Sequence, residues 1–118
     1  MVTPAELTSE LLRLSRLMDD ANRAVRDRGR EQAEAERAYR KARALAWLEA
    51  DGTAQERKDQ VDAATADERY ARDLAESDHR AAWEAVRNYR TQVSALQTIA
   101  GLERETAALA ATGPEVSP

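Results

Sequence analysis

The feature that most constrains this chain is a run of apolar residues from Leu7 to Ala46, whose spacing alternates between four and three without a slip. Residues at this spacing stay on one side of an α-helix, and in a coiled coil they form the seam that faces a partner helix. Only two polar residues interrupt the run. Its members are Leu7, Leu11, Leu14, Met18, Ala21, Val25, Arg28, Gln32, Ala35, Tyr39, Ala42 and Ala46. The run predicts one long amphipathic helix.

Capping signals set the ends of the predicted helices. Thr3-Pro4-Ala5-Glu6 combines a hydroxyl at the N-cap, Pro at the first helical position and Glu three residues after the cap, which is a capping box. A second Thr-x-x-Glu begins at Thr53, directly after Asp51-Gly52, and Gly commonly follows the end of a helix. The sequence therefore predicts a single domain over 3–111, with a helix over about 3–50, a turn at 51–52, a helix over about 53–111 and a disordered tail at 112–118.

The second predicted helix shows the same spacing clearly only from about residue 70. Tyr70 and Leu74 mark its weaker first half, and the clear part consists of Ala82, Val86, Tyr89, Val93, Leu96 and Ala100. A chain that folds back at residues 51–52 places residues whose numbers sum to about 103 side by side. The charges favour this hairpin, because residues 13–43 hold ten basic and six acidic side chains while residues 44–85 hold five and eleven.

Apolar residues outside the seam indicate self-association. Leu17, Ala24, Ala38 and Leu45 form a second column beside the seam, so the apolar stripe is wider than two helices require. We therefore expect an all-α protein, a long antiparallel coiled-coil-like hairpin that assembles into a four-helix or larger bundle. The predicted contacts with another copy or another protein are Leu12, Leu17, Trp47, Leu48 and Trp83.

Composition argues against catalysis and against a membrane protein. The 118 residues include no Cys and a single His79, so neither a thiolate nor a pair of Glu-x-x-His metal motifs is available. The chain has no nucleophile elbow and no phosphate-binding Gly-rich loop. Its longest apolar runs are three or four residues, too short for a membrane span. We expect a non-enzymatic protein with no metal or other cofactor and no membrane contact, located in the cytoplasm.

An arginine column, Arg16, Arg23, Arg30 and Arg37, lies opposite the apolar seam of the first predicted helix. Such a column could follow the phosphates of a nucleic acid. Acidic residues follow the first three of these arginines at a distance of four and can neutralise them: Asp20, Asp27 and Glu34. The net charge of −4 adds to this effect. Nucleic acid is therefore the less favoured partner, after the chain itself and another protein.

Part of the sequence resembles small all-helical proteins of tailed bacteriophages. The resemblance covers about residues 30–100 and depends on Arg37-Ala38-Tyr39-Arg40-Lys41-Ala42, Asp51-Gly52-Thr53, Lys58, Asp62, Arg69, Arg72-Asp73-Leu74-Ala75-Glu76 and Gln97. The genes of those proteins often lie among early recombination and replication genes. The resemblance implies an accessory or scaffold protein of such a process, placed in the host cytoplasm if a phage encodes it, with a virion assembly component as an alternative.

A second resemblance is to the WXG100 family of secreted helical hairpins, which share the length and the turn in the middle of the chain. Here the turn reads Trp47-Leu48-Glu49-Ala50-Asp51-Gly52, so Trp and Gly are five residues apart instead of two. Tyr70 and Asp73 also miss the spacing of the family's tail signal by one residue. A WXG100-like secreted hairpin is therefore a further, less favoured alternative.

Overall fold

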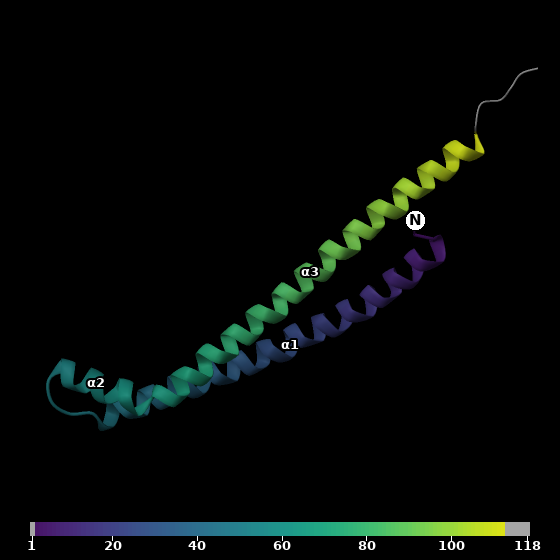
Figure 1. Cartoon of the computed structure of the whole chain (residues 1–118). Coiled ribbons are helices and arrows are strands. Elements are labelled where there is room, and N and C mark those ends of the chain that lie inside the picture. The colour runs from purple at the N-terminus through teal and green to yellow at the C-terminus, as the bar shows by residue number, and fades with distance from the viewer. Residues whose placement is uncertain (1, 113–118) are drawn as a thin grey trace, which may run out of the picture. The chain divides into compact units, whose positions relative to one another are not determined.

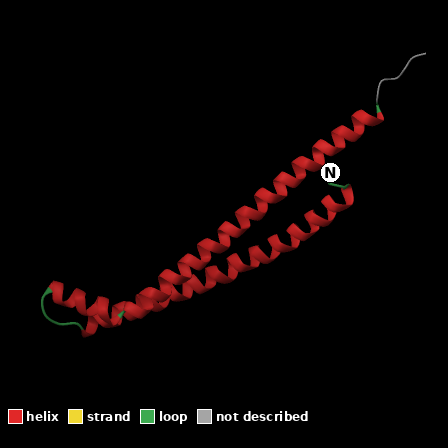
Figure 2. Ribbon diagram, viewed as in Figure 1, coloured by secondary structure: helices red, strands yellow, loops and turns green. Residues whose placement is uncertain are grey.

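The computed structural model describes residues 2–112, which form three α-helices and the short segments between them. In chain order these are α1 (Pro4–Glu49), α2 (Ala54–Ala64) and α3 (Ala66–Ala111) (Figure 1). Figure 2 shows helices and short loops, with no strand, throughout the described part of the chain. The prediction of an all-α helical hairpin is confirmed. Residues 113–118 of the predicted tail lie outside the described residues.

The first helix begins at the capping box that the sequence predicts. The backbone N–H of Thr3 donates to the Glu6 carboxylate at 3.1 Å, and the backbone N–H of Glu6 donates to the Thr3 hydroxyl at 3.1 Å. Each side chain thus satisfies a backbone donor that the first turn leaves without a partner. The helix then continues without a break through Gly29 to Glu49.

The loop between α1 and α2 depends on a glycine and on a glutamine side chain. Gly52 has a φ of 102°, in the left-handed region that costs a residue with a side chain about 1–2 kcal/mol. Gln60 accepts from the Asp51 N–H at 3.3 Å and donates to the Asp51 carbonyl at 2.9 Å. Thr53 caps α2, because its hydroxyl accepts from the Glu56 N–H at 3.2 Å. The turn and its cap therefore lie where the sequence predicts them.

The prediction of one continuous helix over about 53–111 is wrong at Thr65. This residue has φ −114° and ψ 14°, and it separates α2 from α3. Its hydroxyl donates to the Val61 carbonyl at 2.7 Å, in addition to the backbone bond from its own N–H at 3.0 Å. Such a bond favours a bend, but Thr91, Thr98 and Thr106 make the same bond inside the unbroken α3, so it does not by itself end α2. Thr65 is also buried, so the bend lies on the packed side.

The chain divides into two compact units. Unit 1 combines residues 1–20 with residues 85–118, of which 2–20 and 85–112 are described, and unit 2 comprises residues 21–84. In unit 1 the beginning of α1 lies beside the second half of α3, and the two run in opposite directions (Figure 1). Unit 2 contains the rest of α1, the loop, α2 and the first part of α3. The prediction of a single domain over 3–111 stays a prediction.

The seam predicted on α1 is confirmed residue by residue. All twelve members from Leu7 to Ala46 are buried or partly buried. The buried hydrophobic residues of unit 1 are Leu7, Leu14 and Val86. Those of unit 2 are Ala21 and Val61. On the returning helices the matching positions, all buried or partly buried, are Val61, Thr65, Glu68, Arg72, Ala75, His79, Ala82, Val86, Tyr89, Val93, Leu96 and Ala100. We call the α1 and returning positions together the first seam.

The predicted register of the hairpin is wrong in unit 2. Glu36 pairs with Arg72, whose numbers add up to 108 instead of about 103, and Gly29 lies against the ring of His79, which also gives 108. Nearer the loop, Arg43 pairs with Asp62, which gives 105. The offset grows across Thr65, because the interrupted returning arm uses more residues than α1 over the same stretch. A register counted from the turn alone cannot include this interruption.

Two glycines should respond oppositely to alanine. Gly52→Ala places a side chain at positive φ, against the Glu56 side chain, and we expect it to lower the free energy of unfolding by about 1 kcal/mol. Gly101→Ala adds a methyl group inside α3 that meets no side chain or other helix within 4 Å beyond its immediate chain neighbours, and should raise that free energy by about 0.5–1 kcal/mol. Urea denaturation followed by circular dichroism measures both, and changes of the same sign would contradict the structure.

Candidate interaction surfaces

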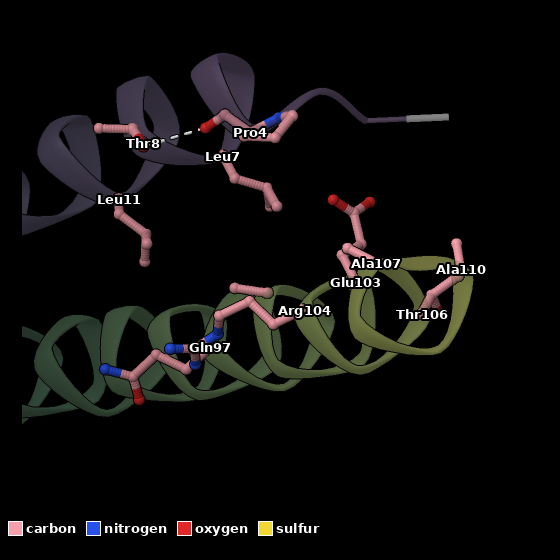
Figure 3. Close-up of a pocket in the computed structure, with 11 residues that line it drawn as sticks. Pro4, Leu7, Thr8, Leu11, Gln97, Glu103, Arg104, Thr106, Ala107 and Ala110 are labelled. Atoms are coloured by element: carbon pink, nitrogen blue, oxygen red, sulfur yellow. Dashed lines mark hydrogen bonds between the residues drawn. The ribbon is translucent and has the colours of Figure 1, made fainter. Parts of the chain in front are cut away.

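A groove in unit 1 lies between the beginning of α1 and the end of α3. Its volume is about 740 Å³. Leu7 and Leu11 point from α1 toward α3, and the Glu103 carboxylate reaches up from α3 (Figure 3). The residues that line it are Pro4, Leu7, Thr8, Leu11, Gln97, Ala100, Glu103, Arg104, Thr106, Ala107 and Ala110. We call this the open groove.

The open groove is suited to apolar contact. Most of its exposed surface is apolar, although five of the eleven lining residues are polar or charged: Thr8, Gln97, Glu103, Arg104 and Thr106. The hydroxyl of Thr8 already donates to the Pro4 carbonyl at 2.9 Å (Figure 3). A groove whose surface is mostly apolar accepts hydrophobic side chains. The surface therefore favours binding over chemistry.

The predicted contact residues are mostly exposed. In unit 1, Leu12 is 55% exposed and Leu17 is partly buried beside the first seam. In unit 2, Trp47 is 41% exposed, Leu48 is 83% and Trp83 is 42%. Side chains of this size rarely stay in water without a role when several lie on one small protein. Their proposed role as contacts stays a prediction.

The sequence analysis missed further exposed apolar residues and misplaced two. Tyr70 and Leu74, taken as markers of the seam, are exposed, because the first seam in this stretch instead follows Glu68, Arg72 and Ala75. The seam positions in this stretch are hard to find from the sequence because several of them are polar, namely Thr65, Glu68, Arg72 and His79. Counting back in steps of three and four from Val86 would have found them. The exposed residues that the analysis did not name as contacts are Val2, Leu45, Tyr70, Leu74, Ile99, Leu102 and Leu109.

A polar cluster replaces the apolar seam in the middle of unit 2. The Arg72 guanidinium lies 4.4 Å from the centre of the Tyr39 ring and 3.8 Å from the Glu36 carboxylate. On the other side of Tyr39, Arg43 donates to the phenol oxygen at 3.4 Å and to Asp62 at 3.0 Å. We call Glu36, Tyr39, Arg43, Asp62 and Arg72 the Tyr39 cluster. Because it joins α1 to both α2 and α3, it favours one register of the hairpin over its neighbours.

The Tyr39 cluster also lowers the pKa of one of its two carboxylates, that of Asp62. The hydrogen bond from Arg43 lowers the pKa of Asp62, and the charges of Arg43, Lys58 and Arg69 act in the same direction. The Arg43 pKa is raised in turn, chiefly by its hydrogen bond to Asp62. Since the folded-state pKa of Asp62 is depressed, its contribution to folding is present above the ordinary carboxyl range and is lost as the pH falls through the lowered pKa.

We expect Arg43→Gln to raise the Asp62 pKa toward that of an ordinary aspartate, because the principal hydrogen bond to the carboxylate is weakened. A carboxyl-detected NMR titration measures the Asp62 midpoint directly. Arg57→Gln is the matched control, since it removes an exposed arginine of α2 that does not contribute to the shift. Equal midpoints in the wild type and in Arg43→Gln would show that the pair does not form in solution.

The only histidine has a packing role. Its ring Nε2 lies 3.3 Å from the position that a Cβ would occupy on Gly29, so the absence of a side chain there makes room for the imidazole. Within the described residues, no group of three or more His, Asp or Glu side chains could hold a metal ion. His79 thus explains why a glycine is tolerated in the middle of α1.

The arginine column lies on the exposed face of α1. Arg16, Arg23, Arg30 and Arg37 are all exposed. Arg37 forms an ion pair with Glu34 at 3.9 Å, three residues before it and not in the predicted pairing of Arg30 with Glu34. Arg23 and Asp20 each have an interaction partner as well. At least two arginines of the column, Arg23 and Arg37, therefore already have an interaction partner within the chain.

Comparison with known proteins gives no family assignment. No family model, curated protein or solved structure matches this chain. No helix in residues 2–112 combines the length and the apolar character that crossing a membrane requires. The features that bear on function are therefore the open groove, the exposed apolar side chains and the arginine column.

Proposed function

We propose that the chain is a non-catalytic helical accessory or scaffold protein that self-associates and acts through contacts with other proteins. The observation that carries this proposal is the ratio of exposed to buried apolar side chains. Among the described residues, eleven large hydrophobic side chains are exposed, whereas the only large ones that are buried are Leu7, Leu14, Val61 and Val86. A hairpin with so small a core gains most from covering its outer apolar surface.

Self-association supplies such a cover. In a four-helix bundle each helix packs against two neighbours, so each needs an apolar stripe wider than the seam of a two-helix coiled coil. The exposed Leu45 and Leu74, on α1 and α3 of unit 2, widen the stripe in this way. The resemblance of residues 30–100 to helical phage proteins supports a role in phage DNA recombination or replication. The protein would act there by holding other proteins together.

The molar mass in solution tests this proposal. Size exclusion coupled to light scattering at micromolar concentration should give a multiple of the 13.1 kDa chain mass. A variant that adds charge at two exposed contacts, Trp47→Glu with Leu48→Glu, should lower the mass if these residues lie in the interface. A 13.1 kDa particle at every concentration tested would refute self-association.

The exposed arginine column favours one second candidate, an oligomer that binds nucleic acid. A protein that uses all four arginines should show a log–log salt slope of about −3 to −4. Fluorescence titration of labelled single-stranded and duplex DNA at several salt concentrations measures that slope. We expect weak or no binding at physiological salt. Tight binding that is lost when Arg16, Arg23, Arg30 and Arg37 are changed to Gln would instead establish the second candidate.

A further inference from the structure

We propose that α3 carries a second helix-pairing seam, and that this seam packs antiparallel against α3 of a second copy of the chain, with Asn88 of each copy facing Gln92 of the other. The inference rests on the proposed self-association and identifies its interface. It concerns residues of α3 alone, a continuous helix from Ala66 to Ala111.

The second seam follows the same alternation of three and four residues as the first. Its members are Ala71, Leu74, Asp78, Ala81, Ala85, Asn88, Gln92, Ala95, Ile99, Leu102, Thr106 and Leu109. Eight of the twelve are apolar. All are exposed except Ala85, which is partly buried, so the hairpin leaves this seam uncovered. Positions at this spacing lie along one side of a helix, and the eight apolar residues among them form a stripe of the kind that packs against another helix.

The length and the small side chains of the second seam fit a helix like those of this chain. From Ala71 to Leu109 it extends over about 57 Å at 1.5 Å per residue. Helices α1 and α3, at 46 residues each, are long enough to cover it. Four of the twelve positions are alanine, which lets two helix backbones approach closely. A second copy of α3 therefore matches the seam in both length and period.

The second seam is also complementary to itself when two copies run in opposite directions. In the register where opposing residue numbers add up to 180, Ala71 faces Leu109 and Ala81 faces Ile99. Leu74 faces Thr106 in the same register. Large side chains thus meet small ones, as close packing requires. Two pairs join a polar residue to a leucine, Thr106 with Leu74 and Asp78 with Leu102, and of these only Asp78 brings a charge. An antiparallel pair of this kind gives both copies identical environments, as a closed dimer needs.

The polar centre of the second seam specifies this register. Asn88 and Gln92 lie in the middle of the twelve positions, and the register of 180 places each opposite the other. Their carboxamide groups each donate and accept, so the two pairs can satisfy one another across the interface. A shift by one heptad, to a sum of 187 or 173, would place Asn88 against Ile99 or Ala85 and Gln92 against Ala95 or Ala81, so both groups would face apolar side chains. A single polar layer commonly selects one register of a coiled coil in this way.

Cysteine crosslinking tests the inference without background, because the chain has no cysteine. Mixing an Ala85→Cys chain with an Ala95→Cys chain under mild oxidation should give a disulfide-linked dimer, since the register brings these positions into one layer. The matched control pairs Ala85→Cys with Ser94→Cys, next to Ala95 but off the seam, and should crosslink at least about tenfold more slowly. Ala85→Cys crosslinking best to itself, or equally to both partners, would overturn the antiparallel seam.

A charge in the second seam gives an independent test. Leu102→Glu, at a position 58% exposed in the hairpin, should reduce the molar mass while leaving the helix content intact, and Ser94→Glu should reduce neither. If the wild type is an oligomer but Leu102→Glu keeps its mass and the crosslink fails, the interface is elsewhere and this inference is wrong. If the wild type is itself a monomer, the proposed function fails as well.

Discussion

Val86→Asp should abolish most of the stability of unit 1 at neutral pH. Val86 has no exposed surface, and its side chain belongs to the first seam on α3. A carboxylate placed there loses its hydration without gaining a partner, and an uncompensated buried charge costs about 3–5 kcal/mol. Unfolding in urea, followed by circular dichroism at a fixed protein concentration, measures the loss.

The pH dependence of this variant distinguishes burial of charge from general damage to the helix. Burial raises the pKa of the introduced carboxyl, so its cost is greatest above that raised pKa and is partly relieved as the pH falls through it. Ser94→Asp places the same group on an exposed position of the same helix and should cost less than about 0.5 kcal/mol. Equal losses in the two variants would mean that Val86 is not in the core.

Leu14→Ala should lower the free energy of unfolding by about 2–5 kcal/mol, because it removes a large aliphatic side chain from a position that is 1% exposed. The core of unit 1 has few other residues that could move into the space. Ser15→Ala, the exposed neighbour, is the control and should change this free energy by less than about 0.5 kcal/mol. A loss below about 1 kcal/mol for Leu14→Ala would place Leu14 outside the core.

The sequence predicts the architecture of α1 well because its seam is apolar and its ends carry local signals. Each residue at a seam position from Leu7 to Ala46 is buried or partly buried, and Thr3 and Thr53 cap their helices. These features depend on spacing within one helix and on neighbours three residues apart. Such information is contained in a short window of sequence.

The parts that the sequence could not predict depend on contacts between helices. The Arg72 guanidinium at a seam position is paired with Asp73 beside it on α3, and it also contacts Glu36 and the Tyr39 ring on α1, which are far from it in sequence. The break at Thr65 has no local sequence signal, since threonines with the same hydrogen bond to the carbonyl four residues earlier lie inside the unbroken α3. That break changes the register beyond it. The second seam on α3 gives a weaker sequence signal than the first, because four of its twelve residues are polar.

We propose that this hairpin completes its apolar packing by binding another copy of itself. Thermal unfolding at about 1 μM and about 100 μM tests it most directly, because a hundredfold rise in the concentration of a binding partner stabilises the folded state by about 2.7 kcal/mol. We predict that the midpoint of unfolding rises by several degrees over this range for the wild type, and by less for Leu102→Glu. A midpoint that is the same at both concentrations for the wild type would contradict the account.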